Sequence, residues 1–175
     1  MFYLNNTHKF KIFFSLFLVV SLVSNCGFQP LYFVKDGVNL SSIESQIEVK
    51  NIDGRTGQIL RNSLLEKFGS ESSNTKTLSL KITLTKSVVP LAFRRDKTVT
   101  RFNVIIDADY ILKNLSNGKI LTDGTSSSIA SYSVVFSEFA NLSAARDAEE
   151  RAVIDISKNI SRIVGFYLIN LEDNK

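Results

Sequence analysis

Asp107 and Asp109 are the residues of this chain that most resemble a catalytic pair. They are separated by one residue, so in a strand both carboxylates lie on the same face, and paired carboxylates can share the acid and base steps of a hydrolysis. Little else supports catalysis: the one histidine, His8, lies in an N-terminal segment that we expect to be removed, and no P-loop or dinucleotide-binding glycine motif is present. We therefore expect a solvated face near Lys81 or Lys113, no enzyme activity, no cofactor and no metal. A hydrolase centred on the two aspartates stays open as an alternative.

Residues 1–25 have the pattern of a secretory signal. Lys9 and Lys11 form a basic start, and Ile12 to Val23 is an apolar run broken only by two serines. As a helix this run would span roughly 18 Å at about 1.5 Å per residue, which is short for a bilayer core of about 30 Å. We expect export rather than a membrane-spanning anchor, because no polar face interrupts the run as it would in a buried helix.

Cys26 ends this segment and is the only cysteine of the chain. The five residues up to it resemble a bacterial lipobox, Leu22-Val23-Ser24-Asn25-Cys26, in which the cut precedes the cysteine and lipid is attached to it. Asn25 departs from the small residue usual there, and Gly27 is compatible with sorting to the outer membrane. The alternative is a small buried thiol, although an exported chain with one cysteine cannot form an internal disulfide. We expect a lipidation site at Cys26 and a lipidated tether over residues 26–42.

The charge balance does not indicate a nucleic-acid partner. The formal net charge is +4, but Lys9 and Lys11 are the only charged residues before Cys26, so the rest of the chain carries +2. A nucleic-acid-binding domain would show a basic face and a high isoelectric point over the domain itself.

A basic, apolar segment lies between the two clearest strands. The connection from Val88 to Thr98 holds an apolar group followed by three cations, Arg94, Arg95 and Lys97, and Arg101 lies just beyond it. We interpret it as a hairpin tip. Arginine forks match phosphate oxygens, so an anionic lipid is one ligand for this tip, and a solvated basic turn or one that pairs with acids of a partner is the alternative.

Three strands and a helix account for residues 43–113. The strands are Ile43 to Ile52, Thr77 to Lys86 and Val99 to Lys113, each with apolar side chains on alternate positions. Thr56 to Phe68 has apolar residues at helical spacing and is followed by Gly69, which is typical of a helix end.

A third long strand and a second helix complete the chain. Asn117-Gly118 indicates a hairpin turn, and Ile120 to Val135 follows as a strand with Ile120 inward. Its middle, Thr125 to Ser128, is weakly patterned and is expected to be frayed or bulged. The last helix is expected from a cap at Ser143 to about Leu171. Its inward side chains recur at spacings of three and four: Ala145, Ala148, Ala152, Ile156, Ile160, Ile163 and Tyr167.

This order predicts an α+β fold. We expect a two-layer sandwich of a four-stranded, mostly antiparallel sheet with both helices on one face, in the order β-α-β-β-β-α. The sandwich is expected to be one domain over residues 43–175, because the sequence shows neither repeats nor a second linker.

Two stretches of the chain resemble the LPS-assembly lipoproteins of the LptE family, in its short, divergent branch. The first is Cys26-Gly27-Phe28-Gln29-Pro30-Leu31-Tyr32, and the second runs from Tyr132-Ser133-Val134 and Phe139-Ala140-Asn141 into Ala145-Arg146-Asp147-Ala148-Glu149-Glu150-Arg151-Ala152. The expected element order also matches that family. Phe33 stands where glycine is common.

The resemblance implies a binding role without turnover. Family members bind and plug the lumen of the outer-membrane LPS-translocon barrel LptD and help it assemble, so a lipid-anchored protein at the periplasmic face of the outer membrane is expected. The LPS-binding residues of the family lie on basic strand loops, and Arg94, Arg95, Lys97 and Arg101 are the corresponding expectation here. A generic periplasmic lipid-binding or scaffold lipoprotein is the alternative.

Overall fold

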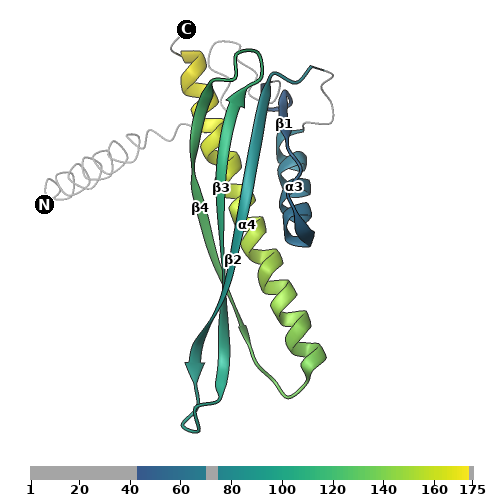
Figure 1. The fold of residues 1–175 in the computed structure, drawn as a ribbon, viewed down its shortest axis with the longest axis vertical. Coiled ribbons are helices and arrows are strands. Elements are labelled where there is room, and N and C mark those ends of the chain that lie inside the picture. The colour runs from purple at the N-terminus through teal and green to yellow at the C-terminus, as the bar shows by residue number, and fades with distance from the viewer. Residues whose placement is uncertain (1–42, 70–74, 174–175) are drawn as a thin grey trace, which may run out of the picture. The chain divides into compact units, whose positions relative to one another are not determined.

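The computed structural model describes residues 43–69 and 75–173. The chain divides into two units between Phe33 and Val34, and every described residue belongs to the second. Its elements follow the order β1 (Ile47–Val49), α3 (Gly54–Phe68), β2 (Leu78–Phe93), β3 (Val99–Asn114), β4 (Ile120–Ser133) and α4 (Glu138–Asp173) (Figure 1). The predicted α+β order is confirmed.

The four strands form one mixed sheet in the order β1-β2-β3-β4. β1 pairs with β2 in parallel, whereas β2–β3 and β3–β4 are antiparallel. β1 is parallel because α3 carries the chain back along the sheet before β2 begins, which is the usual crossover for parallel neighbours. The two helices pack against each other and against one face of the sheet, as expected.

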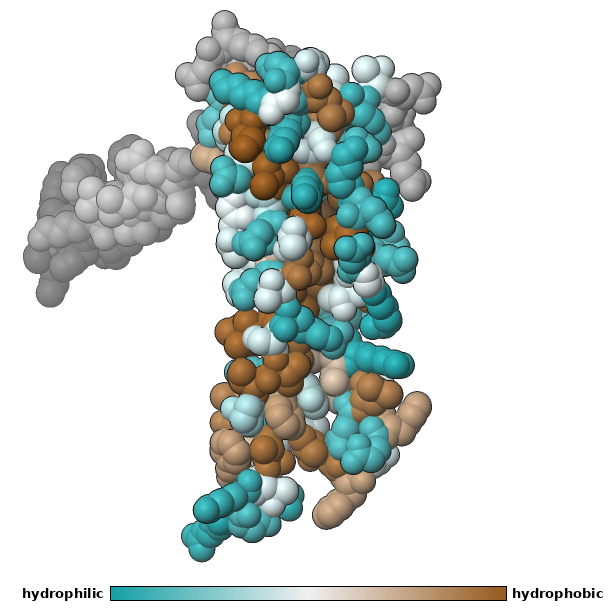
Figure 2. Space-filling view, viewed as in Figure 1, coloured by the Kyte–Doolittle hydropathy of each residue, from teal (hydrophilic) through white to brown (hydrophobic). Residues whose placement is uncertain are grey.

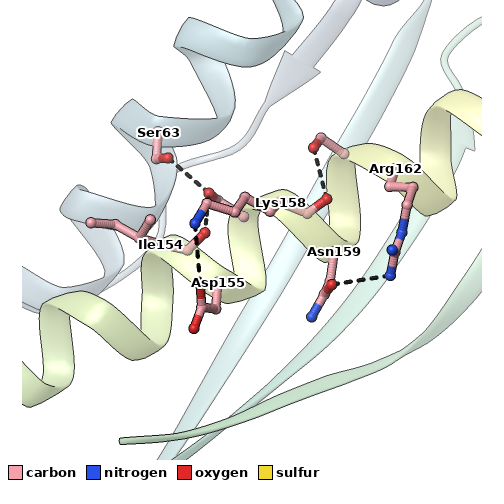
Figure 3. A network of polar contacts seen from close by, with 8 residues as sticks. Ser63, Ile154, Asp155, Lys158, Asn159 and Arg162 are labelled. Atoms are coloured by element: carbon pink, nitrogen blue, oxygen red, sulfur yellow. Dashed lines mark hydrogen bonds and ion pairs between the residues drawn. The ribbon is translucent and has the colours of Figure 1, made fainter. Parts of the chain in front are cut away.

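The core lies between this face and the helices. Side chains at alternate positions of β2 and β3 are buried against α3 and α4, and the fully buried ones include Leu80, Ile106, Leu112, Leu60 and Leu64. Ser157 of α4 is also fully buried. Its hydroxyl donates to the Ile154 carbonyl at 2.7 Å and lies 2.8 Å from the Ser63 hydroxyl of α3, so the only hydrogen of Ser157 is used and Ser63 supplies the other (Figure 3).

The first predicted strand is shorter than expected. Only Ile47–Val49 pair with β2, while Ile43 and Glu44 are helical and the Gln46 amide donates to the Ile43 carbonyl at 3.0 Å. Ile43 nevertheless packs against the core. An apolar side chain such as that of Ile43 indicates burial, and a residue in a helical turn can be buried as readily as one in a strand.

β2 is longer than predicted, and the expected loop over Val88 to Thr98 is wrong over its first half. Residues as far as Phe93 pair with β3, with Pro90 opposite Phe102, and register shifts follow on both sides of Ala92. The Lys50 amide donates to the Leu80 carbonyl at 3.0 Å, so the backbone groups of Leu80, and of every second residue after it, point away from β3. Pro90 is one of these residues, and its missing N–H therefore removes no hydrogen bond between β2 and β3.

Three expectations for the C-terminal half are also wrong. The middle of β4, Thr125 to Ser128, pairs with β3 without a bulge, and the one register shift lies between Leu112 and Lys113. Ile120 is 49% exposed rather than inward. Helix α4 begins at Glu138, because Ser137 rather than Ser143 starts it: the Ala140 amide donates to the Ser137 hydroxyl at 3.3 Å.

The buried face of α4 follows the predicted spacing as far as Ile160. Beyond it Val164 and Leu168 are buried, while Ile163 is 37% exposed and Tyr167 is partly buried. From Ala148 onward the buried positions recur every four residues, at Ala152, Ile156, Ile160, Val164 and Leu168. A step of four residues turns a helix of 3.6 residues per turn by about 40° more than a full turn, so the buried stripe winds around α4 and Val164, rather than Ile163, continues it.

Candidate functional site

The hairpin tip is the turn Arg94–Thr98 together with the strand ends that carry it. The Arg94 amide donates to the Thr98 carbonyl at 2.9 Å, and Lys97 closes the turn with a positive φ of 67°. The Asp96 carboxylate accepts from the Thr98 hydroxyl at 2.5 Å and from its amide at 3.0 Å. The hydroxyl bond, ahead of the amide bond, lowers the pKa of Asp96. The only acid of the turn is therefore occupied in shaping it.

The four cations predicted as a binding site lie at this tip. Arg94, Arg95 and Lys97 are in the turn, and Arg101 is in the first part of β3, opposite Ala92 and Ser133. All four side chains are exposed, and none forms an ion pair within the described part of the chain. Their charges are thus available to an anionic ligand or partner.

Apolar side chains are exposed beside these cations. Four of them lie in the last part of β2: Val88, Val89, Leu91 and Phe93. The sheet face on the helix side adds a stacked aromatic pair, Phe102 and Tyr132, with ring centroids 5.7 Å apart and planes at 22°. Brown and tan residues accordingly reach almost to the teal end of the hairpin in Figure 2.

A second exposed apolar group, which we call the aromatic turn, consists of Val135, Phe136, Phe139 and Leu142. Phe136 is 102% exposed and Phe139 is 82% exposed. The Val134 amide donates to the Thr100 carbonyl at 2.9 Å, so the connection between β4 and α4 leaves the sheet at the same end as the hairpin tip (Figure 1). Sequence reasoning missed this group as a site; the signal was an aromatic residue on each side of a helix start.

Asn141 holds the aromatic turn in shape. Its side-chain oxygen accepts from the Val135 amide at 2.8 Å, and its side-chain nitrogen donates to the Val135 carbonyl at 2.9 Å. Both backbone groups of Val135 are therefore satisfied by one side chain. The turn is a built feature that presents Phe136 and Phe139 to solvent rather than a frayed strand end.

The two predicted carboxylates lie away from the tip on the outer face of the sheet. Asp109 accepts from the Thr125 hydroxyl at 2.6 Å, and Asp107 lies between Thr85 and Ser127 on the neighbouring strands. No group of three metal-ligating side chains occurs among residues 43–69 and 75–173. The structure thus places both carboxylates among hydroxyl-bearing neighbours of the adjacent strands.

The predicted lipidation site, Cys26, and the signal and tether around it lie outside the described residues. Within the described helices, none is long and apolar enough to cross a membrane.

Comparison with known proteins bears on both fold and family. The family model of LptE, lipopolysaccharide-assembly, matches residues 43–164. No curated protein sequence matches the chain. Among solved structures, a protein of Caulobacter crescentus CB15 described as a lipoprotein is 22% identical with a TM-score of 0.64, over 75% of this chain and 96% of that one.

Two further structures share the fold. A minor lipoprotein of Acinetobacter baumannii is 16% identical with a TM-score of 0.53, over 68% of this chain and 91% of that one. The rare lipoprotein B of Shewanella oneidensis is 13% identical with a TM-score of 0.52, over 72% of this chain and 96% of that one. At these identities the likeness concerns the fold.

Proposed function

The chain belongs to the lipopolysaccharide-assembly family LptE, and we propose that it is an outer-membrane lipoprotein that plugs the LPS-translocon barrel LptD and assists LPS assembly at the outer leaflet. The observation that carries this proposal is the end of the sheet formed by the hairpin tip and the aromatic turn. Large side chains such as Phe136 and Phe139 are rarely left in water without a binding role when they lie together. The role is one of binding and positioning, and it requires no catalytic residue.

We further propose that the cations of the tip contact lipid A. A lipid with phosphates on its head group and several acyl chains needs donors of charge-assisted hydrogen bonds beside an apolar surface. Arg94, Arg95 and Lys97 are exposed beside Leu91 and Phe93, which supports such a match. Each charge-assisted bond contributes roughly 1.5–3 kcal/mol when it forms.

Binding of the purified chain to LPS tests this part of the proposal. The variant Arg94→Ala/Arg95→Ala/Lys97→Ala should bind more weakly than wild type and lose most of the salt dependence. The matched control, Lys81→Ala/Lys113→Ala/Lys119→Ala, removes three exposed cations from β2, β3 and the connection between β3 and β4, and it should bind like wild type. Equal, salt-insensitive binding by wild type and the tip variant would exclude the tip. Intact LPS binding with lost barrel assembly would instead assign these cations to the protein partner.

The anchor and the barrel are tested in the envelope. Mass spectrometry of the mature protein should find lipid on Cys26 and no residues 1–25, and Cys26→Ala should shift the protein toward the soluble fraction. Affinity purification of the lipidated chain from a detergent extract should bring down the barrel protein. Recovery of the lipidated chain without any barrel would favour a generic lipid-binding lipoprotein.

A further inference from the structure

α4 and the sheet draw apart toward the end that carries the hairpin tip. Ala152 and Ala148 of α4 are fully buried against the sheet. Ala144 and Ala140, which lie four and eight residues earlier on the same side of the helix, are only partly buried. The first turns of α4 therefore stand away from the strands, as Figure 1 also shows.

The strands show the same loss of burial on the face that α4 covers. On β3, Ile106 and Val104 are buried, whereas Phe102 is only partly buried. Val88 of β2 pairs with Val104, and Pro90 pairs with Phe102, so these two residues lie on the same face. Val88 is nevertheless 46% exposed.

We call this open region between sheet and helix the wedge. Its sheet side consists of Val88, Pro90, Phe102 and Tyr132, and its helix side includes Ala140 and Ala144. None of these residues is charged. The wedge thus presents apolar and aromatic side chains that no described residue covers completely.

The two ends of the wedge differ in charge. At its inner end Lys86 of β2 donates to the Glu149 carboxylate at 2.8 Å, and Glu149 also accepts from the Thr56 hydroxyl at 3.1 Å. These inner charges therefore already have partners. At the outer end, Arg94 and Arg95 of the hairpin tip form no ion pair among residues 43–69 and 75–173.

This arrangement matches a ligand with an anionic head and an apolar tail. From Pro90 to Lys86, β2 extends over about 13 Å at roughly 3.3 Å per residue, which gives a tail an apolar path along the strand. The free cations lie beyond Pro90, where the head would be. Charge complementarity therefore sets the direction of the ligand.

We propose that the wedge holds an acyl chain of lipid A, with the phosphates of the same molecule at the hairpin tip. This inference rests on the proposed function and adds the place of the acyl part to it. The tail enters beside Phe102 and Tyr132 and ends before the ion pair of Lys86 and Glu149, where burial of a methyl group would be opposed by the charges.

The backbone of the sheet favours an acyl chain over an extended peptide. β2, β3 and β4 pair with one another across the wedge, so their backbone groups are already hydrogen-bonded there. A peptide lying on this face would bury amide groups without partners, which costs free energy. An acyl chain has no such group, and its burial is favourable.

The position of Ile43 favours lipid A over the lipid expected on Cys26. The described part of the chain begins at Ile43, and the nearby Gln46 carbonyl accepts from the Thr77 amide at 3.1 Å. Thr77 immediately precedes β2, so this entry point lies at the end of the sheet opposite the wedge.

Photo-cross-linking of the full chain in the envelope tests the occupant. A benzophenone amino acid in place of Val88 should form an adduct with LPS, because Val88 faces the wedge. The same amino acid in place of Val89 is the matched control, since Val89 is the next residue, similarly exposed and on the opposite face. The proposal is overturned if Val88 gives no LPS adduct, gives an adduct with a protein alone, or reacts no better than Val89.

Binding of acylated and deacylated LPS to the purified full chain separates the wedge from the tip. Wild type should bind intact LPS about tenfold more tightly than the same LPS without acyl chains, the equivalent of roughly two buried methylene groups. Val88→Trp should fill the wedge and lose this preference, whereas Val89→Trp should keep it. Both side chains are exposed, so thermal midpoints near wild type are expected and should be measured alongside.

The tip variant Arg94→Ala/Arg95→Ala/Lys97→Ala makes the two possible failures distinguishable. It should bind both forms of LPS more weakly and still prefer the acylated one. Equal binding of both forms by wild type, with weaker binding by the tip variant, would overturn the wedge and leave the cationic tip as the lipid A contact. Absence of LPS binding by wild type would overturn both.

Discussion

Gly57 lies in the first half of α3, where the helix passes the segment that leaves β1. A Cβ atom at this position would lie 2.7 Å from Ile52 Cγ2 and 2.8 Å from the Ile52 carbonyl oxygen. The second atom belongs to the backbone and cannot rotate away. At the residue scale, this close approach determines where α3 sits against β1.

Gly57→Ala is therefore expected to destabilise the fold. Helix propensity alone would stabilise α3 by roughly 1 kcal/mol, but the contact with Ile52 should cost more and give a net loss of about 1–3 kcal/mol. Urea unfolding measures the difference. Gly124→Ala is an informative comparison, because its nearest neighbour at 2.8 Å is the movable Tyr110 hydroxyl, and its loss should be smaller. A stabilised Gly57→Ala protein would contradict the contact.

Glu44 is the carboxyl with the largest effect of burial. Desolvation by burial raises the pKa of Glu44 from its usual 4.5 to about 7. Between these values the folded protein binds more protons than the unfolded chain, so the stability contributed by this group is present at low pH and is lost as pH rises through about 7.

Glu44→Gln should remove this dependence. We expect the thermal midpoint of wild type to fall between pH 4.5 and pH 7 by more than that of Glu44→Gln, and the variant to be the more stable at pH 8. Thermal unfolding across this range is the measurement. Parallel pH profiles for the two proteins would show that Glu44 is solvated.

At the element scale, α4 is the helix that packs against β3, β4 and α3. Its buried face begins with the small residues Ala148 and Ala152 and continues with larger ones, Ile156, Ile160 and Val164, all fully buried. Small side chains at the start let the helix backbone approach the sheet closely, and Glu149 accepts from Lys86 of β2 at 2.8 Å beside that approach.

Ala152→Phe should overpack this contact and cost about 1–3 kcal/mol. Lys158→Phe, at an exposed position of the same helix, is the control and should change stability little. Thermal melting of both variants makes the comparison. An unchanged midpoint for Ala152→Phe would mean that this face of α4 is not packed, and loss of the barrel partner at an unchanged midpoint would make it an interface.

At the scale of the whole folded unit, most of the buried side chains and the proposed binding surface lie at different ends of the sheet. The end of the sheet where β1 pairs with β2 and where α3 packs contains most of the buried side chains. The other end carries the hairpin tip and the aromatic turn. Residues at this second end are exposed, so their replacement should affect binding without affecting folding.

Phe136→Ser/Phe139→Ser should leave the free energy of unfolding within about 0.5 kcal/mol of the wild-type value. Recovery of the barrel partner, or of LPS, should fall markedly, because two nearly fully exposed rings are removed. Thermal melting together with affinity purification tests the separation. A large loss of stability would assign the aromatic turn to the core instead.

Local and periodic features of this fold were readable from the sequence alone. Alternation along Leu78, Leu80 and Ile82 predicts the buried face of β2, and Gly69, which has φ of 59° in the structure, ends α3 as predicted. These signals are local because side-chain direction follows from the strand or helix period, and a left-handed cap favours glycine whatever surrounds it. The basic residues of the tip could likewise be found from their clustering.

Features that depend on a partner elsewhere in the chain were decided by tertiary structure. β2 continues through Pro90 because β3 offers Phe102 opposite it, and the serine-rich middle of β4 is regular because its pairing with β3 continues there. Ile43 is part of the core without being in a strand. Phe136 and Phe139 are apolar like core residues, and only the packed structure shows that nothing in the described fold covers them. Burial and strand pairing are relations between distant segments, and such relations cannot be read from the spacing of residues within one segment.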